Sequence, residues 1–221
     1  MGTTAEGNEI LARLKATRIV PVIVIDDPVD AAPLGAALIQ GGLPCAEVTF
    51  RTRAAADAIA RMVGECPGLL VGAGTVLTPQ QAARAREVGA QFIVAPGFNP
   101  AVVDYCIEHE IPVFPGVCTP TEIEMALGKN LQVLKFFPAE EAGGLAFLKA
   151  VAAPYAGVEF MPTGGISLAN LTTYLAFNRV VACGGSWMAP SEWIAGKQFD
   201  RIRAATERAV TTIRAGSGAR A

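Results

Sequence analysis

Residues 113–152 read VFPGVCTPTEIEMALGKNLQVLKFFPAEEAGGLAFLKAVA, and this stretch contains the repeating unit from which the fold can be predicted. Two short apolar runs, Val113–Val117 and Val133–Phe137, each precede a segment with helical spacing, Thr121–Leu127 and Leu145–Ala152. Runs rich in Val and Phe and bounded by Pro or Gly are typical of strands, and apolar residues three and four positions apart are typical of helices. The stretch therefore predicts two β-then-α units.

The same unit recurs along the chain. The predicted strands are Ile19–Ile25, Ala46–Arg51, Leu70–Val76, Gln91–Ala95, Val113–Val117, Val133–Phe137, Glu159–Thr163 and Val180–Cys183. The predicted helices are Val29–Ile39, Ala54–Val63, Pro79–Val88, Pro100–Glu108, Thr121–Leu127, Leu145–Ala152, Leu168–Ala176 and Ser191–Ile213. Strands that are apolar throughout favour a parallel sheet covered by helices on its outer face. The pattern predicts an α/β protein with a (β/α)8 (TIM) barrel, for which a chain of 221 residues is long enough.

An open, doubly wound sheet is the structural alternative. Its dinucleotide-binding form is disfavoured because Gly72-Ala73-Gly74 lacks the third glycine of the fingerprint. The amphipathic segment Asn8–Leu14 is predicted to form an extra N-terminal helix over one opening of the barrel. No linker divides the chain, so we expect one barrel domain over residues 1–214, including this helix, and a flexible C-terminal tail over residues 215–221.

The amino-acid composition argues against several kinds of binding partner. The chain is 52% hydrophobic and 17% charged, with a formal net charge of −2 and no long basic run. Such a chain has no electrostatic footprint for nucleic acid or an anionic membrane, so we expect neither partner. The apolar runs are far shorter than the roughly 20 residues that span a bilayer, and the acidic N-terminus does not resemble a signal peptide. We expect a cytoplasmic protein whose five scattered cysteines are reduced.

Lys135 is the one lysine of five that interrupts an apolar strand, in the run Val133-Leu134-Lys135-Phe136-Phe137. One interpretation is structural: the stem is buried and the ammonium reaches the barrel rim or pairs with a carboxylate. The other is functional, because burial disfavours a charged amine and so favours a nucleophilic lysine.

Glu47 is the acidic counterpart in a second strand. Residues 47, 49 and 51 share a strand face, so Glu47 and Arg51 are expected to point toward the same interior. The two side chains can form an internal ion pair. Alternatively, Glu47 transfers protons and the planar fork of Arg51 binds a substrate carboxylate.

Glycine pairs follow the last two predicted strands. Gly164-Gly165 comes after the seventh strand and Gly184-Gly185 after the eighth. Loops at these positions are the usual phosphate site of (β/α)8 barrels, because glycine lets backbone N–H groups approach an anion closely. Either pair alone is compatible with a tight turn, whereas both together indicate a phosphorylated substrate.

Metal chemistry has few ligands to draw on. The single histidine, His109, ends a predicted helix and has no second histidine to complete a site. The same scarcity disfavours Cys–His or Ser–His catalysis, which needs a base beside the nucleophile. We therefore expect no metal and a lysine-centred mechanism.

Several motifs together resemble those of the 2-keto-3-deoxy-6-phosphogluconate (KDPG) aldolases, over roughly residues 10–213. They are EVTFRT (47–52), VGAGTV (71–76), PG (96–97), PGV (115–117), KFFPAE (135–140), PTGGI (162–166) and GGSW (184–187). The resemblance implies a class I aldolase barrel that assembles as a homotrimer, works without a cofactor and belongs to the Entner-Doudoroff pathway. Two residues depart from the family pattern, Phe50 and Cys118, and they bear on substrate range.

The resemblance also implies roles for individual residues. Lys135 would form the Schiff base and Glu47 would be the general acid and base. The residues implied for the pyruvyl carboxylate are Arg51 and Thr75, those implied for the pocket wall are Pro96, Phe137 and Thr163, and those implied for the phosphate are Gly164, Gly165, Gly184 and Ser186.

The implied reaction cleaves 2-dehydro-3-deoxy-6-phosphogluconate into pyruvate and glyceraldehyde 3-phosphate. Two further aldol cleavages use the same lysine chemistry, those of 4-hydroxy-2-oxoglutarate and of the galactonate-derived epimer. A non-catalytic phosphosugar-binding barrel, in which Glu47 and Lys135 only pair, is the alternative from another class.

Overall fold

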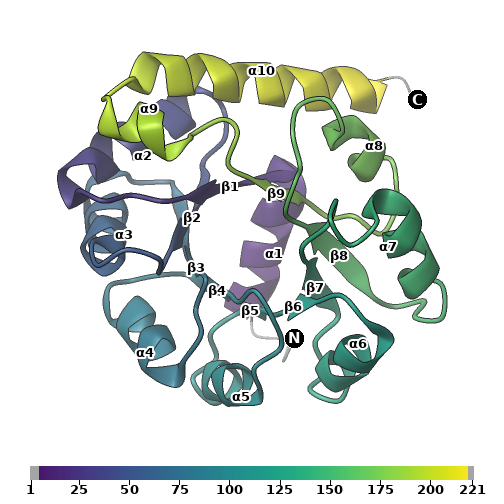
Figure 1. The fold of residues 1–221 in the computed structure, drawn as a ribbon. Helices are drawn as coiled ribbons and strands as arrows, with labels where there is room; N and C mark the ends of the chain where they lie inside the picture. Colours follow the sequence, from purple (N-terminus) through teal and green to yellow (C-terminus); the bar gives the residue numbers. More distant parts are fainter. Residues whose placement is uncertain (1–4, 219–221) are drawn as a thin grey trace.

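The computed structural model describes residues 5–218, and within them parallel strands form a closed ring surrounded by helices (Figure 1). The strands are β1 (Ile19–Ile23), β2 (Cys45–Thr49), β3 (Leu70–Gly74), β4 (Phe92–Val94), β5 (Val113–Phe114), β6 (Gly116–Val117), β7 (Val133–Phe136), β8 (Glu159–Pro162) and β9 (Cys183–Gly185). The helices are α1 (Ala5–Thr17), α2 (Ala31–Gln40), α3 (Ala55–Glu65), α4 (Pro79–Glu87), α5 (Pro100–Glu108), α6 (Pro120–Leu127), α7 (Gly144–Ala152), α8 (Leu171–Leu175), α9 (Ser191–Ala195) and α10 (Phe199–Gly218), with a 3₁₀ turn at Pro28–Asp30.

The ring closes through two hydrogen-bonded sheets. One has the order β5-β4-β3-β2-β1-β9 and the other β6-β7-β8, and every strand pair is parallel. Pro115 separates β5 from β6 within a single predicted strand, because proline has no N–H for the ladder. Isolated bridges, Phe160 to Val180 and Thr163 to Gly184, join the two sheets on the other side. The predicted (β/α)8 barrel is therefore confirmed, and the open sheet is wrong.

Three helices begin with the same local signal. Thr78 accepts a hydrogen bond from the Gln81 N–H, Asn99 accepts one from Ala101, and Thr119 forms a reciprocal capping box with Glu122. A proline follows each cap at the first helical position, where its missing N–H costs nothing. These caps begin α4, α5 and α6 directly after the loops at the carboxyl ends of the strands.

The core has two layers. The larger layer lies between the strands and the surrounding helices. The smaller one fills the barrel with side chains such as Phe92, Phe114 and Met161, and continues into Ile10 and Leu14 of α1. Both α1 side chains are almost completely buried, so α1 covers the amino-terminal opening as predicted. The helix extends beyond the predicted segment at both ends.

Most predicted elements begin or end within a few residues of the observed bounds, and three differences have a structural basis. The last strand lies at Cys183–Gly185 instead of Val180–Cys183, because residues 183–185 pair with β1 while Val180 forms only an isolated bridge. The predicted helix 191–213 is broken between α9 and α10, where Lys197 has a φ of 53°. Residues 215–218 of the expected tail continue α10, and residues 219–221 lie outside the described part of the chain.

None of the helices within residues 5–218 has the length and apolar character needed to cross a membrane.

Candidate active site

A cavity of about 270 Å³ opens at the carboxyl ends of the strands. It is lined by residues on β1, β7 and β9 and in the loops after several strands: Val22, Arg51, Thr75, Pro96, Lys135, Phe137, Thr163, Gly164, Gly165, Ile166, Gly184, Gly185 and Ser186. This end of a (β/α)8 barrel carries the active site in characterised enzymes of the fold. Every predicted site residue except Glu47 lines this cavity.

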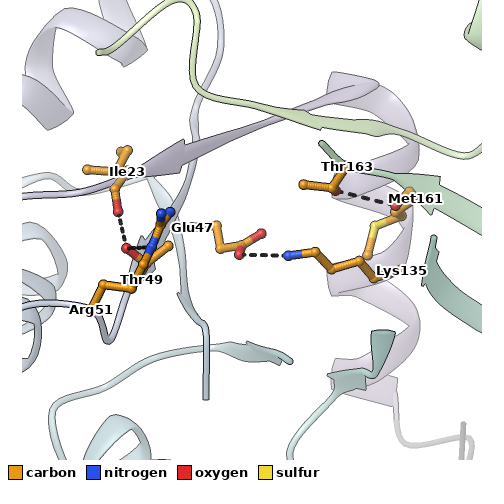
Figure 2. Close-up of polar contacts among 7 residues, drawn as sticks. All are labelled: Ile23, Glu47, Thr49, Arg51, Lys135, Met161 and Thr163. Carbon is orange, nitrogen blue, oxygen red and sulfur yellow. Dashed lines mark hydrogen bonds and ion pairs between the residues drawn. The ribbon is translucent and has the colours of Figure 1, made fainter. Parts of the chain in front are cut away.

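Glu47 lies in the barrel interior next to Lys135. The two side chains extend from β2 and β7 toward each other, and 3.6 Å separates Lys135 Nζ from Glu47 Oε1 (Figure 2). The exposed fraction is 6% for the Lys135 side chain and 3% for the Glu47 side chain. Gly74 on β3 makes room for the carboxylate, because a Cβ there would collide with the Glu47 side chain. The barrel thus places a buried amine beside a buried carboxylate.

In the described part of the chain, the Glu47–Lys135 pair leaves one buried carboxylate oxygen without a hydrogen bond. Oε1 of Glu47 has no hydrogen-bond partner within residues 5–218, since the amine is beyond hydrogen-bond distance. A buried ionic group normally completes its hydrogen bonds, and exceptions call for an explanation. Lys135 Nζ also lies 5.3 Å from the centre of the Phe137 ring, at the base of the cavity. The amine can therefore reach a substrate while a proton acceptor lies beside it.

Arg51 takes a different position from Glu47, although the two share a strand face in sequence. Its Nε donates to Thr49 Oγ1 at 3.2 Å, and Thr49 donates to the Ile23 carbonyl at 2.8 Å (Figure 2). The interpretation of Glu47 and Arg51 as an internal ion pair is wrong, because Lys135 is the charged partner of Glu47. Arg51 lies just beyond β2, where its side chain is exposed at the cavity.

Thr75 carries backbone strain. Its φ is 55°, in the left-handed region that a β-branched residue seldom adopts. Thr75 directly follows β3, and it lines the cavity together with Arg51 and Pro96. Backbone strain of this kind clusters at functional sites, where the surrounding structure maintains it.

The glycines form the opposite wall. Gly164 and Gly165 have φ of 101° and 71°, values that glycine adopts without strain. Gly184 lies so close to Thr163 Oγ1 that a Cβ would collide with it, and the exposed Ser186 follows β9. Sequence reasoning missed Val22, Ile166 and Gly185 as lining residues. The last two adjoin predicted residues, and Val22 is an ordinary apolar strand residue with no signal of its own.

The two departures from the family pattern lie outside the cavity lining. The Cys118 N–H donates to Glu122 at 2.7 Å, and burial, with the Glu122 charge, raises the pKa of the Cys118 thiol. Phe50 packs against the larger core layer, between the strands and the surrounding helices.

Metal ligands do not gather in the part of the chain that the structure describes: no three His, Cys, Asp or Glu side chains group there in a way that could hold an ion. His109 ends α5, stacks on Tyr105 and has Nδ1 2.9 Å from the Tyr105 carbonyl oxygen. It is therefore a helix-end residue outside the cavity lining.

A closed parallel barrel with an amine and a carboxylate buried beneath a glycine-walled cavity belongs to the class of (β/α)8 enzymes that act through a lysine. The family model "KDPG and KHG aldolase" matches residues 10–205. The chain belongs to this family of aldolases, which are lyases.

Relatives agree over nearly the full length. The 2-dehydro-3-deoxy-phosphogluconate aldolase of Treponema pallidum is 50% identical over 92% of this chain and 97% of its own. The crystal structure of the 2-keto-3-deoxy-6-phosphogluconate aldolase of Zymomonas mobilis with 3-phosphoglycerate has a TM-score of 0.86 at 38% identity, covering 92% of this chain and 95% of the other. The KDPG aldolase of Legionella pneumophila, with pyruvate captured as a covalent carbinolamine, also has a TM-score of 0.86 at 38% identity, covering 90% and 96%.

Proposed function

We propose that this chain is a single-domain class I aldolase that cleaves 2-dehydro-3-deoxy-6-phosphogluconate to pyruvate and glyceraldehyde 3-phosphate through a Schiff base on Lys135. The observation that carries the proposal is the buried pair at 3.6 Å, with the amine reaching the cavity and the carboxylate beneath it. The carbinolamine captured in the Legionella pneumophila relative supports the same chemistry.

The first steps form the electron sink. Neutral Lys135 Nζ attacks the C2 carbonyl carbon of the substrate, the carbonyl oxygen takes up a proton, and a carbinolamine results. Loss of water then gives an iminium. Glu47 is the only carboxylate paired with this amine within residues 5–218, so it takes and returns the protons of these steps.

Cleavage follows from the iminium. The electron pair of the C3–C4 bond moves toward the iminium nitrogen and leaves an enamine, while Glu47 accepts the proton of the C4 hydroxyl. The C4 carbon departs as the aldehyde of glyceraldehyde 3-phosphate. Protonation of the enamine at C3 and addition of water release pyruvate and restore the free amine.

Opposite walls of the cavity hold the two ends of the substrate. Arg51 and Thr75 bind the carboxylate next to the reacting carbon, since a guanidinium fork matches a carboxylate. Gly164, Gly165, Gly184 and Ser186 bind the phosphate, and Pro96, Phe137 and Thr163 shape the space between. The binding energy of the remote phosphate then positions the C3–C4 bond over the amine.

A second substrate is 4-hydroxy-2-oxoglutarate. The Escherichia coli relative called KHG/KDPG aldolase is 44% identical over 87% of this chain and 90% of its own. The same lysine serves this substrate and the galactonate-derived epimer. The glycine wall favours the phosphorylated substrate as the main one.

Three further features belong to the proposal. We infer a cytoplasmic homotrimer whose partners are small molecules and not nucleic acid or membranes. The covalent iminium provides the electron sink, so the reaction needs neither metal nor organic cofactor. Activity should therefore survive exhaustive treatment with a chelator.

Trapping with pyruvate tests the proposal. Pyruvate and borohydride should add one pyruvyl group to the wild-type chain, and peptide mapping should locate it on Lys135. Lys135→Ala should abolish both labelling and cleavage, whereas Lys149→Ala should change neither. An adduct on another lysine would contradict the assignment, and the absence of any adduct would favour a non-catalytic phosphosugar-binding barrel.

A further inference from the structure

Two side chains of the α8 region hold the loop that follows β8, although neither lines the cavity. Asn170 precedes α8, and Tyr174 lies within it, four residues later. Residues at this spacing lie on the same side of a helix. Asn170 bonds directly to Gly165, whereas Tyr174 bonds to Glu140, whose backbone N–H in turn bonds to Gly164.

Asn170 makes two hydrogen bonds to the loop. Its Oδ1 accepts from the Ser167 N–H at 2.8 Å, and its Nδ2 donates to the Gly165 carbonyl at 3.1 Å. In a trans peptide the C=O and the N–H point in opposite directions. Holding the Gly165 oxygen on Asn170 therefore turns the Ile166 N–H the other way, and Ile166 lines the cavity.

Tyr174 acts on the neighbouring peptide through Glu140. Its hydroxyl donates to the Glu140 carboxylate, and the Glu140 N–H donates to the Gly164 carbonyl at 3.2 Å. The same peptide argument turns the Gly165 N–H away from Glu140. The side chain of Glu140 also packs against Gly165, where a Cβ would lie 2.6 Å from Glu140 Cβ. Burial and the Glu140 charge raise the pKa of Tyr174, so the phenol keeps the proton that it donates.

The two N–H groups that result are unused. Across residues 5–218, neither the Gly165 nor the Ile166 N–H meets an acceptor. Two successive N–H groups beside glycines with positive φ form an anion-binding concavity. We propose that Asn170 and Tyr174 are positioning residues that aim the N–H groups of Ile166 and Gly165 at the substrate phosphate, an inference that rests on the proposed function.

The test compares two single variants, Asn170→Ala and Tyr174→Phe, on two substrates. The readout is the kcat/KM for 2-dehydro-3-deoxy-6-phosphogluconate divided by that for 2-dehydro-3-deoxygluconate. A hydrogen bond to a charged group is worth enough that each variant should lower this ratio about tenfold. The activity on the unphosphorylated substrate and the rate of pyruvate trapping at Lys135 should stay within about twofold of wild type. Neither 2-dehydro-3-deoxygluconate nor pyruvate carries the phosphate group that this loop binds.

The chain offers matched controls. Asn99, which precedes α5, also accepts one hydrogen bond and donates another, accepting from Ala101 and donating to the Leu77 carbonyl, and Tyr155 donates its hydroxyl to Glu124. Asn99→Ala and Tyr155→Phe remove equivalent bonds elsewhere, so they should leave the substrate ratio unchanged. The general effect of losing two asparagine hydrogen bonds or a tyrosine–carboxylate bond is then separated from the loss of phosphate positioning.

Calorimetric binding of inorganic phosphate tests the loop without catalysis, and we expect about tenfold weaker binding in both variants. Unchanged phosphate binding and an unchanged substrate ratio would overturn the positioning role. If Asn170→Ala fails to fold, Tyr174→Phe, which keeps the ring, decides the question. A wild-type chain that binds phosphate but neither traps pyruvate nor cleaves either substrate would contradict the proposed function, and the phosphate affinities of the variants would still decide the positioning role.

Discussion

The two ends of the barrel differ in the side chains that they bury: apolar ones at the amino-terminal end and charged ones at the carboxyl end. At the amino-terminal end, Ile10 and Leu14 of α1 continue the apolar interior, and Lys15 pairs with Glu159 at the surface, 2.7 Å apart. At the carboxyl end, the interior gives way to Glu47 and Lys135 under an open cavity. One end buries apolar area and the other maintains ionic groups without full hydrogen bonding. The difference indicates that stability and chemistry are assigned to separate ends of one fold.

Among the changes that compare the two ends and keep Lys135, Glu47→Gln should have the largest effect, a loss of catalytic rate. The amide keeps the shape of the side chain but cannot take up a proton, and general acid–base catalysis is worth roughly 10²–10⁴-fold. We expect kcat for cleavage to fall by about that factor, and exchange of pyruvate methyl protons into deuterated water to fall in parallel.

Glu159→Gln is the matched control at the other end, since Glu159 also pairs with a lysine. It should leave both rates unchanged. Unchanged proton exchange in Glu47→Gln would assign the proton transfer to another group.

Leu14→Ala should lower the free energy of unfolding and leave the rate of Schiff-base formation at Lys135 unchanged. Leu14 is fully buried beneath the barrel, and removing such a side chain costs about 2–5 kcal/mol of unfolding free energy. Urea denaturation measures the loss, and pyruvate trapping at Lys135 below the transition should proceed at the wild-type rate. Leu77→Ala, at a leucine that is 49% exposed, should cost less than about 0.5 kcal/mol. A trapping rate that fell together with stability would show that the two ends are coupled.

Removing the phosphate from the substrate should lower kcat/KM by on the order of 10² or more, because charge-assisted hydrogen bonds contribute roughly 1.5–3 kcal/mol each. Steady-state kinetics with the two substrates measures this. Ser186→Ala should reproduce part of the loss, since its exposed hydroxyl lines the cavity. Equal kcat/KM values for both substrates would reduce the glycine pairs to turns and favour 4-hydroxy-2-oxoglutarate as the main substrate.

Lys15→Ala should have the smallest effect. The ion pair with Glu159 is half exposed, and such pairs contribute roughly 0.2–1 kcal/mol. Urea denaturation should show a loss within that range that shrinks at high salt. A loss above about 2 kcal/mol would mean that the pair anchors α1 about as strongly as the Leu14 side chain does.

Local patterns carried most of the prediction. The alternation of apolar runs with helical spacing indicated the barrel because each unit is encoded within a short window. Lys135 stood out because a lysine in a buried strand needs a partner or a task. For Glu47 the sequence left two partners open: Arg51, close by on the same strand face, and Lys135, on a distant strand that only ring closure brings near. The structure pairs Glu47 with Lys135.

Boundaries failed where tertiary contacts outweighed local preference. Residues 180–182 are apolar and resemble a strand, yet the pairing with β1 falls on Cys183–Gly185, where Gly184 lies so close to Thr163 that a side chain would collide. Residues 215–218 have a loop-like composition, but they continue a long helix that packs along α2 and α8.

Periodicity and composition were enough to predict the repeating unit, the class of fold and the residue types available for chemistry, because both are properties of the chain alone. Three features emerged only when the chain was folded: which charges meet, how far Glu47 lies from Lys135, and which way the peptides after Gly164 and Gly165 face. Those features depend on contacts between segments far apart in the chain, and the free energy of such contacts is set by the closed barrel as a whole.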